Sequence, residues 1–338
     1  MSSELDGLQT PALLVDGAAF DHNLASMGEA LPGARLRPHV KAHKCTSIAR
    51  AQAANGHRTF TAATIREVEV LAANGLGDDL LLANEVVDAT RLGRAAEEHG
   101  ARITVAVDSE ATIDAALHGG VREVLVDVNV GLPRCGCDPE DAGRLADRAR
   151  SKGLSVRGVM GYEGHVVGLP DRAERLEKVA ESMALLVRAA QLVAADEGII
   201  STGGTGTYDI NTWGTEIQAG SYALMDTAYN ELQLPFRQAL TVLATVISVS
   251  QKYAVADCGL KALGMDHGLP SLGDAGKVWF CSDEHITFAP APDRPVRVGD
   301  RVQVVPGHVD PTVAYHEVFH VVREGRVSET WPVDMRGW

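Results

Sequence analysis

Residues 103–130 have the sequence ITVAVDSEATIDAALHGGVREVLVDVNV. The two ends, Ile103–Val107 and Val124–Val130, are rich in valine and isoleucine, which is typical of buried strands. Between them, Glu110–Leu117 has the alanine-rich, amphipathic pattern of a short helix. A strand followed by a helix and a second strand indicates a right-handed βαβ unit in a parallel sheet.

The same alternation extends from about residue 37 to about residue 225. The other β-rich segments are Leu36–Lys41, Thr59–Ala63, Leu80–Asn84, Val156–Tyr162, Gly198–Thr202 and Glu216–Leu224. The other helix-like segments are Cys45–Asn55, Ile65–Asn74, Val86–His99, Pro139–Lys152 and Ala173–Ala195. Eight such strands predict an α/β fold with a (β/α)8 TIM-like barrel. A doubly wound sheet is the alternative, but it would usually have fewer strands and a phosphate loop directly after the first one.

The last hundred residues have a different pattern, without long helical segments. Short β-rich runs are separated by Gly, Pro and Asp; they are Leu240–Val249, Tyr253–Asp257, Lys277–Phe280, Arg301–Val305 and Glu317–Val322. This pattern predicts a mostly antiparallel β domain. Because Ala12–Val15 is also strand-like, we expect a barrel over residues 16–235 and a second domain made of residues 1–15 plus 236–338.

The composition excludes several classes of partner. The chain has 338 residues, 45% of them apolar, and a net charge of −14, which disfavours binding to nucleic acid or to an anionic membrane surface. We find no apolar run of membrane-spanning length and no signal peptide at the N-terminus. The five cysteines are scattered and odd in number, so we expect a reduced, cytoplasmic protein. A small molecule is therefore the expected partner.

A basic block, Arg37-Pro38-His39-Val40-Lys41-Ala42-His43-Lys44, follows the first β-rich run. A lysine at the end of a buried strand is costly to desolvate, and this cost lowers its pKa. Such a lysine attacks carbonyl groups and holds them as a Schiff base. The alternative is a solvated basic turn, but the proline and both histidines are unusual in such a turn.

Polar residues follow other predicted strands at the end where barrel enzymes have their active sites. The run Ser201–Thr207 contains Gly204 and Thr205, whose amide and hydroxyl groups suit a phosphate group. Gly220 and Ser221 occupy the matching place on the next strand. A phosphate site opposite a Schiff-base lysine suggests pyridoxal 5'-phosphate. Glycine-rich loops of this kind are common, so the run alone is a weak signal.

A second histidine-rich segment, Pro306–Thr312, contains His308 and Asp310. If the segment is a strand, residues two apart project from the same face. Imidazole and carboxylate together suit a divalent metal ion. The alternative is an ordinary His–Asp hydrogen bond, and His316 and His320 are equally explained by burial.

Five segments together resemble the D-threonine aldolase / D-serine dehydratase family, which consists of pyridoxal-phosphate enzymes of the alanine racemase fold type. They are Arg37–Lys44, Arg134, Gly203–Thr207, Glu216–Tyr222 and Pro306–Thr312. The resemblance spans the chain from Thr10-Pro11-Ala12 to its end. It implies a barrel followed by a β domain, and a homodimer.

The resemblance also implies roles for single residues. Lys41, rather than Lys44, holds the cofactor as a Schiff base, and Arg134 reaches its phenolic oxygen. Gln218 falls where alanine racemases have an arginine against the pyridine nitrogen, and a neutral glutamine cannot make the same charged contact. The other residues implied at the cofactor are His39, Tyr162, Gly204, Thr205, Gly220, Ser221 and Tyr222. Tyr162 also matches an active-site tyrosine of the aldolases, so the resemblance implies a catalytic role for it.

The metal motif separates the branches of this family. Dehydratases of the family have His-x-Cys and zinc, whereas the aldolases have His-x-Asp with Mn2+ or Mg2+, as His308 and Asp310 do here. We therefore expect an aldolase that cleaves D-β-hydroxy-α-amino acids to glycine and an aldehyde. Candidates for the base are His165, a metal-bound hydroxide and Asp283, in that order. A dehydratase giving a 2-oxo acid and ammonia is the alternative, and a non-catalytic cofactor-binding protein is a more distant one.

Overall fold

The computed structural model describes residues 4–338 and divides into two compact units. The first, which we call the barrel unit, contains residues 27–41, 48–220 and 337–338. The second, which we call the β unit, contains the residues up to 26, 42–47 and 221–336. No helix among the described residues has the length and apolar character needed to cross a membrane.

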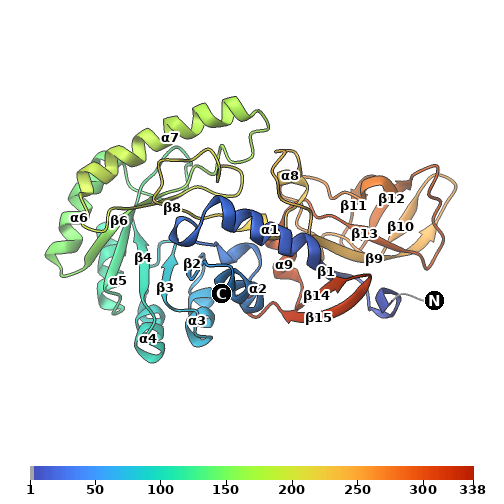
Figure 1. Cartoon of the computed structure of the whole chain (residues 1–338), viewed down its shortest axis with the longest axis horizontal. Helices are drawn as coiled ribbons and strands as arrows, with labels where there is room; N and C mark the ends of the chain where they lie inside the picture. The colour runs from blue at the N-terminus through green and yellow to red at the C-terminus, as the bar shows by residue number, and fades with distance from the viewer. Residues whose placement is uncertain (1–3) are drawn as a thin grey trace. The chain divides into compact units, whose positions relative to one another are not determined.

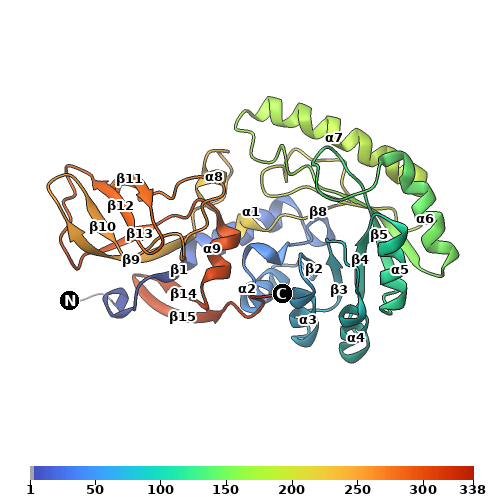
Figure 2. The ribbon, with the colours of Figure 1, turned by 180° about the vertical axis from the view of Figure 1, so that it is seen from behind.

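The barrel unit is built on a curled parallel sheet of seven strands in the order β2-β3-β4-β5-β6-β7-β8. The strands are β2 (Thr59–Ala62), β3 (Asp79–Leu82), β4 (Ile103–Val107), β5 (Glu123–Asp127), β6 (Ser155–Gly161), β7 (Ile199–Thr202) and β8 (Glu216–Ile217). The helices are α2 (Thr46–Ala54), α3 (Ile65–Ala73), α4 (Thr90–His99), α5 (Glu110–His118), α6 (Ala142–Ser151) and α7 (Arg172–Val193). Figures 1 and 2 show the helices α3–α7 along the outer side of the curled sheet. The predicted α/β fold class is therefore confirmed.

The prediction of an eighth strand at Leu36–Lys41 is wrong. Leu36 and His39 make only isolated parallel bridges, to Ile217 next to β8 and to Thr61 in β2. The intervening Pro38 has no N–H group, so a continuous hydrogen-bonded ladder cannot form there. The segment nevertheless lies between β8 and β2, because the amide of His39 bonds Ala219 O at 3.1 Å and that of Thr61 bonds Pro38 O at 2.9 Å.

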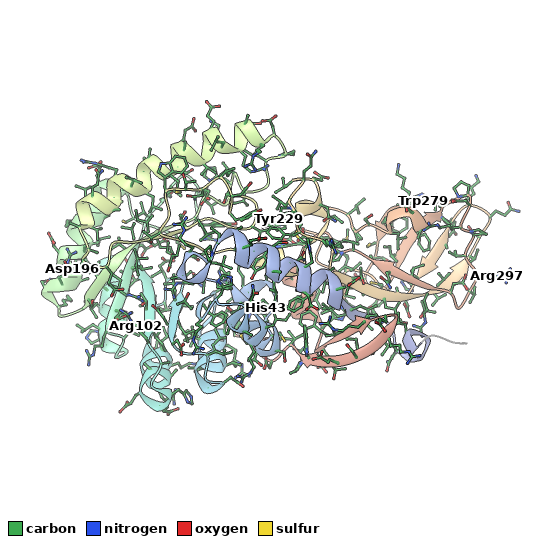
Figure 3. All side chains as sticks on the ribbon, viewed as in Figure 1. His43, Arg102, Asp196, Tyr229, Trp279 and Arg297 are labelled. Carbon is green, nitrogen blue, oxygen red and sulfur yellow. The ribbon has the colours of Figure 1, made fainter. Side chains whose placement is uncertain are left out.

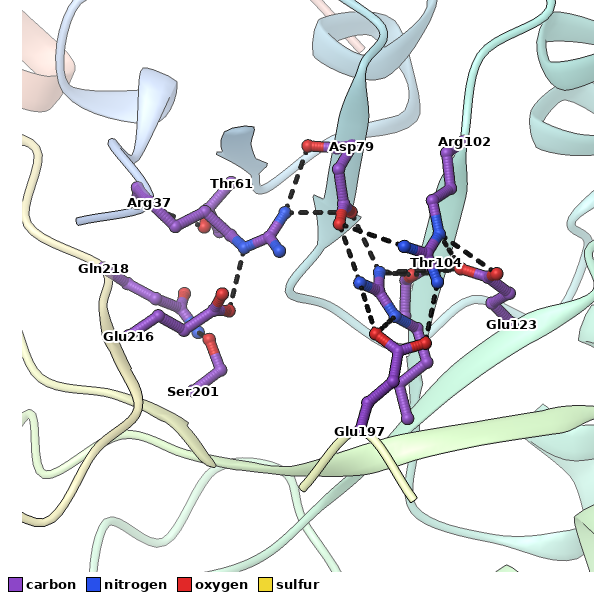
Figure 4. A network of polar contacts seen from close by, with 11 residues as sticks. Arg37, Thr61, Asp79, Arg102, Thr104, Glu123, Glu197, Ser201, Glu216 and Gln218 are labelled. Atoms are coloured by element: carbon purple, nitrogen blue, oxygen red, sulfur yellow. Dashed lines mark hydrogen bonds and ion pairs between the residues drawn. The ribbon is translucent and has the colours of Figure 1, made fainter. Parts of the chain in front are cut away.

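Buried ion pairs fill the barrel at the amino ends of its strands, as Figure 4 shows. Asp79, the first residue of β3, pairs with Arg37 at 3.1 Å and with Arg157 at 2.7 Å. Arg37, only 3% exposed, also pairs with Glu216 of β8 at 2.8 Å. Arg37 of the basic block thus links β8 to β3 at the amino ends of these strands. Its side chain therefore has a structural role there and does not lie at the carboxyl end of the sheet.

The β unit is built on an eight-stranded sheet in the order β11-β12-β10-β9-β1-β14-β15, with β13 paired to β9. The strands are β1 (Ala12–Asp16), β9 (Leu240–Val249), β10 (Ala254–Ala256), β11 (Gly276–Cys281), β12 (Ile286–Pro290), β13 (Arg301–Val304), β14 (Val318–Arg323) and β15 (Arg326–Pro332). The expected pairing of Ala12–Val15 with this sheet is confirmed, since β1 lies antiparallel to β9. It is also parallel to β14, so the sheet is mixed rather than purely antiparallel.

Several elements lie outside the predicted set. They are α1 (Gly17–Ala30), α8 (Thr227–Asn230), α9 (Val309–Tyr315), β12 and β15. The predicted strand Glu216–Leu224 ends at Ile217, and Ser221–Ala223 form a short 3-10 turn instead. Gly220 follows the strand closely, and a chain that reverses within a few residues cannot continue a sheet ladder.

Candidate active site

Lys41 lies in a short 3-10 turn, Val40–Ala42, directly after the segment that joins β8 to β2. Its backbone amide donates to Nδ1 of His39 at 3.4 Å, and the amide of His39 donates to the carbonyl of Ala219. His39 is buried, whereas Lys41 is partly exposed. The turn thus holds the Lys41 backbone next to the loop that follows β8, at the carboxyl end of the barrel sheet.

Arg134 and Tyr162 come together from the loops after β5 and β6. The guanidinium carbon of Arg134 lies 5.8 Å from the centroid of the Tyr162 ring. The two side chains line a small polar pocket with Asn129, Leu132 and Cys135. Burial raises the pKa of the Cys135 thiol to about 11, so this cysteine is a neutral lining group rather than a thiolate ligand.

Gly204, in the loop after β7, lies against the same tyrosine. A Cβ atom at this position would stand 3.4 Å from Cε2 of Tyr162 and 3.7 Å from Val167. The neighbouring Thr205 is buried. Any side chain on Gly204 would therefore take up space beside the aromatic ring, and this cradle suits the phosphate-bearing cofactor that the sequence predicts.

His165 lies at the exposed rim of these loops. Its ring packs over Gly131, since a Cβ atom there would come within 2.9 Å of Cε1 and Nε2 of the imidazole. Gly131 has a φ of 122°, a conformation that side-chain-bearing residues rarely adopt. The loops after β5 and β6 thus meet at His165, three residues after Tyr162 along the second loop.

Gln218 lies beyond the end of β8 and is oriented by β7. Its amide nitrogen donates to Oγ of Ser201 at 2.9 Å, as drawn in Figure 4. This hydrogen bond fixes the orientation of the Gln218 side chain within the barrel unit. Most of the predicted cofactor residues belong to the barrel unit; they are Lys41, His39, Arg134, Tyr162, Gly204, Thr205, Gln218 and Gly220.

Sequence reasoning missed Glu163, a fully buried carboxylate beside Tyr162. It accepts hydrogen bonds from Gly203 N at 3.2 Å and from Thr207 Oγ1 at 2.8 Å, both in the loop after β7. Its place inside the Gly-Tyr-Glu-Gly-His run was visible in the sequence. Because glutamate is seldom fully buried, the sequence alone would place this side chain in solvent. Only the fold shows that it is directed into the protein.

In the β unit, Ser221 and Tyr222 lie in the 3-10 turn after the end of the barrel sheet. Tyr222 is completely buried, and its ring centroid stands 5.6 Å from that of Phe236. The carbonyl of Ser221 accepts hydrogen bonds from the amides of Leu224 and Met225. Tyr222 is therefore a core residue of its own unit as well as a predicted cofactor residue.

His308 and Asp310 do not lie on a strand, contrary to the expectation above. His308 is the N-terminal cap residue of α9, and Asp310 is in the first turn of that helix. The two remain close, with Nε2 of His308 3.6 Å from Oδ2 of Asp310. A carboxylate in the first turn is favoured by the helix dipole, which explains why this residue type is compatible with a helix start.

The structure adds Asp266 and His267 to this pair. Nδ1 of His308 lies 2.8 Å from Oδ2 of Asp266, and the rings of His267 and His308 stack with centroids 3.7 Å apart. Asp266, His267 and His308 each offer a ligand atom within 4.8 Å of the others. Imidazole and carboxylate donors fit a divalent ion of intermediate or hard character. His316, in contrast, is buried and bonds the carbonyl of Ala262 at 3.0 Å.

Charges around His308 decide its protonation. Burial acts to lower the pKa of His308, but the hydrogen bonds and charges of Asp310 and Asp266 outweigh it and raise the pKa above its usual range. Burial likewise acts to raise the pKa of Asp266, and the bond to His308 reverses this and lowers it. A strongly held proton on His308 is a proton that a metal ion has to displace.

Comparison with protein families divides the chain at nearly the same place as the structure does. Residues 15–227 match the family model described as "Alanine racemase, N-terminal domain". Residues 239–322 match the model described as "Putative serine dehydratase domain".

Relatives match over almost the whole chain. A D-threonine aldolase of Arthrobacter sp is 35% identical over 98% of this chain and 93% of the relative. A 3-hydroxy-D-aspartate aldolase of Paracoccus denitrificans (strain Pd 1222) is 31% identical over 98% and 92%. A D-threo-3-hydroxyaspartate dehydratase of Delftia sp. (strain HT23) is 27% identical over 100% of both chains. Among solved structures, D-threonine aldolase from Filomicrobium marinum superposes with a TM-score of 0.92 at 33% identity, covering 100% of this chain and 99% of the other.

Proposed function

Because this chain belongs to the D-threonine aldolase / D-serine dehydratase family of pyridoxal-phosphate enzymes with the alanine racemase fold, we propose that it cleaves D-β-hydroxy-α-amino acids to glycine and an aldehyde. It is a lyase, and D-threonine-like compounds are the proposed substrates. The observation that carries the aldolase proposal is the His308–Asp310 pair, which has a carboxylate where the resemblance gives dehydratases a cysteine.

Pyridoxal phosphate, when bound, supplies an electron sink for the carbanion that forms at the substrate α-carbon. We assign its anchoring to Lys41, with the phosphate held by Gly204, Thr205, Gly220 and Ser221. The remaining residues assigned to it are His39, Arg134, Tyr162, Gln218 and Tyr222. The glycine cradle beside Tyr162 and the bond that orients Gln218 support this assignment.

For the metal ion, we assign Nε2 of His308 and the carboxylate of Asp310 as ligands. The position of Asp266 at Nδ1 supports this choice, since a carboxylate on one imidazole nitrogen leaves the other for the metal. Oxygen donors favour Mn2+ or Mg2+ over Zn2+. His165 is the proposed base for the β-hydroxyl proton, and its exposed ring is accessible to a substrate.

Dehydration is the second candidate, because the dehydratase of Delftia sp. also matches along the entire chain. Both reactions start from the same D-amino acid but release different products. Purified protein supplied with pyridoxal phosphate and Mn2+ is incubated with D-threonine and with D-3-hydroxyaspartate. We expect glycine and an aldehyde. A 2-oxo acid and ammonia without glycine would establish the dehydratase, and no product from any D-β-hydroxy amino acid would favour a non-catalytic cofactor-binding protein.

We further propose a cytoplasmic homodimer with domains at residues 16–235 and at 1–15 plus 236–338. The β unit supports the dimer, because Trp279, labelled in Figure 3, forms an exposed aromatic pair with Tyr253. Phe280, the next residue along the chain, is 54% exposed. The five cysteines are all free thiols, which suits a reducing compartment. Light scattering coupled to size-exclusion chromatography tests the dimer, and a monomer at micromolar concentration would refute it.

A further inference from the structure

Glu163 is a fully buried acidic residue of the barrel unit. Its side chain is 0% exposed, and among residues 4–338 the structure gives it no ion pair. Instead, all its recorded partners are neutral donors from the two segments that follow β6 and β7. Burying a carboxylate lowers the stability of the fold unless its oxygens are fully hydrogen-bonded. This arrangement therefore indicates that Glu163 has a specific role.

Four donors share the two oxygens of Glu163. Oε2 accepts from Thr202 Oγ1 at 3.1 Å and from Gly203 N at 3.2 Å. Oε1 accepts from Thr207 Oγ1 at 2.8 Å and from Asn211 Nδ2 at 2.9 Å. The donors cover residues 202–211, so one carboxylate ties together both ends of the loop that contains Gly204 and Thr205.

The hydrogen bonds of Glu163 also reach, through Thr207, a residue that is predicted to bind the phosphate group, Gly204. The amide of Gly204 donates to Thr207 Oγ1 at 3.2 Å, and this hydroxyl in turn donates to Glu163. Gly203 turns the chain with a φ of 79°, and its amide is held by the same carboxylate. The carbonyl of Glu163 also accepts the amide of Val166 at 2.9 Å, which closes the turn containing His165.

We propose that Glu163 is a positioning residue that holds the loop Gly203–Thr207 in the shape that binds the phosphate group of the cofactor. The proposal rests on the proposed function, because it assumes that Gly204 and Thr205 contact this phosphate. The carboxylate acts through the hydrogen bonds it accepts. It does not touch the cofactor, and it takes no proton during the reaction.

The test compares two ligands that differ only in the phosphate group. Dissociation constants of pyridoxal phosphate and of pyridoxal are measured by absorbance titration of cofactor-free, full-length protein. Their ratio reports the contribution of the phosphate site without any measurement of activity. In Glu163→Met, which keeps the size of the side chain but removes all acceptors, we expect the preference for pyridoxal phosphate to fall by about tenfold or more, equivalent to about 1.4 kcal/mol.

Glu163→Gln separates hydrogen bonding from charge. Glutamine keeps one acceptor oxygen for Thr202 and Gly203, and its NH2 group replaces the oxygen that accepts from Thr207 and Asn211. The Thr207 hydroxyl can accept from this NH2 group instead of donating, and Asn211, whose buried Oδ1 has no hydrogen-bond partner among the described residues, can turn its amide to accept as well. We therefore expect Glu163→Gln to keep the wild-type preference within about threefold. If the preference falls as far as in Glu163→Met, a charge-dependent role replaces the proposed one.

Glu67→Met is the matched control. Glu67 is also fully buried, and it caps α3 by accepting hydrogen bonds from the amides of Ala63 and Thr64. Its loss should lower stability without changing the preference. If Glu163→Met does not fold, Thr207→Val removes one donor and the Gly204 acceptor together, and Thr207→Ser restores both.

The outcomes distinguish this inference from the proposed function. A folded Glu163→Met or Thr207→Val variant with the wild-type preference overturns the inference alone. Equal affinity of the wild-type protein for pyridoxal phosphate and pyridoxal means that the protein has no phosphate site, and the proposed function then fails with it.

Discussion

At the scale of single residues, Lys41 and Lys44 have different structural environments although only two residues separate them. Lys44 has a φ of 48°, and its carbonyl accepts the amide of Met335 at 3.0 Å. Lys44→Ala keeps this backbone bond and the same left-handed conformation, so we expect it to keep the visible absorbance of bound cofactor. Lys41→Ala should lose this absorbance, because the anchoring amine is gone. Loss of the band in Lys44→Ala alone would move the anchor to that residue.

Asp266 is expected to set the affinity for the metal ion through His308. Replacing it with asparagine leaves Nδ1 of His308 without a carboxylate, so the ring is held less firmly and is a weaker ligand. We expect Asp266→Asn to bind Mn2+ about 10- to 100-fold more weakly in calorimetric titrations. Asp274→Asn, at an exposed position of the same unit, should bind Mn2+ like the wild-type protein. Equal binding by both variants would contradict the role of Asp266.

At the scale of elements, Asp79 of β3 contributes to the ion pairs that connect β3, through Arg37, to β8. Asp79→Asn removes the carboxylate that Arg37 and Arg157, both nearly inaccessible to solvent, share, so that Arg37 keeps only Glu216 and Arg157 keeps Glu197 and Glu123, both more exposed than Asp79. Removing one partner of a buried pair costs about 3–5 kcal/mol, and we expect a loss of about 3 kcal/mol in urea unfolding. The neighbouring Asp78→Asn breaks only an exposed pair with Arg58, so about 0–1 kcal/mol is expected. Equal losses would show that the buried pairs contribute little.

The same carboxylate makes the barrel sensitive to acid. Burial acts to raise the pKa of Asp79, but the hydrogen bond from Arg157 and the charge of Arg37 outweigh it and hold the pKa at about 2. Because the folded state has the lower pKa, this stabilisation is complete above the ordinary value near pH 4 and is lost as the pH falls towards 2. Unfolding free energies measured between pH 5 and pH 2 should therefore fall less steeply in Asp79→Asn than in the wild type. Parallel slopes would exclude a depressed pKa.

Elements with strong local patterns were predicted well, and those stabilised by distant partners were not. Ile103–Val107 and Leu240–Val249 have the predicted bounds, since apolar β-branched residues mark them without reference to the rest of the chain. Leu36–Lys41 looked equally strand-like, but Pro38 has no N–H group to donate, and the segment makes only isolated bridges to its neighbours β2 and β8. The short helix α9 was missed because three of its seven residues, Val309, Thr312 and Val313, are β-branched and have weak helix propensity.

At the scale of the whole molecule, the assigned cofactor and metal residues form two sets without a shared member. Treatment with a chelator should therefore leave the absorbance of the bound cofactor unchanged while product formation stops, and added Mn2+ or Mg2+ should restore it. Spectra and product assays on the same sample test this. Full activity in the presence of chelator would remove His308 and Asp310 from the mechanism, whereas loss of the absorbance would show that the metal also holds the cofactor.

Local patterns along the chain were enough to predict a barrel followed by a β domain, because periodicity and turn residues act over a few positions. They also singled out most of the candidate site, since Lys41, Gly204 and His308 stand in conspicuous polar runs. The carboxylates that hold these residues in place, however, are known only from the tertiary structure. Asp266 lies 42 residues from His308, and Glu163 lies 40 residues from Gly203. A buried carboxylate and its donors are brought together only by folding, so no spacing along the chain reveals them.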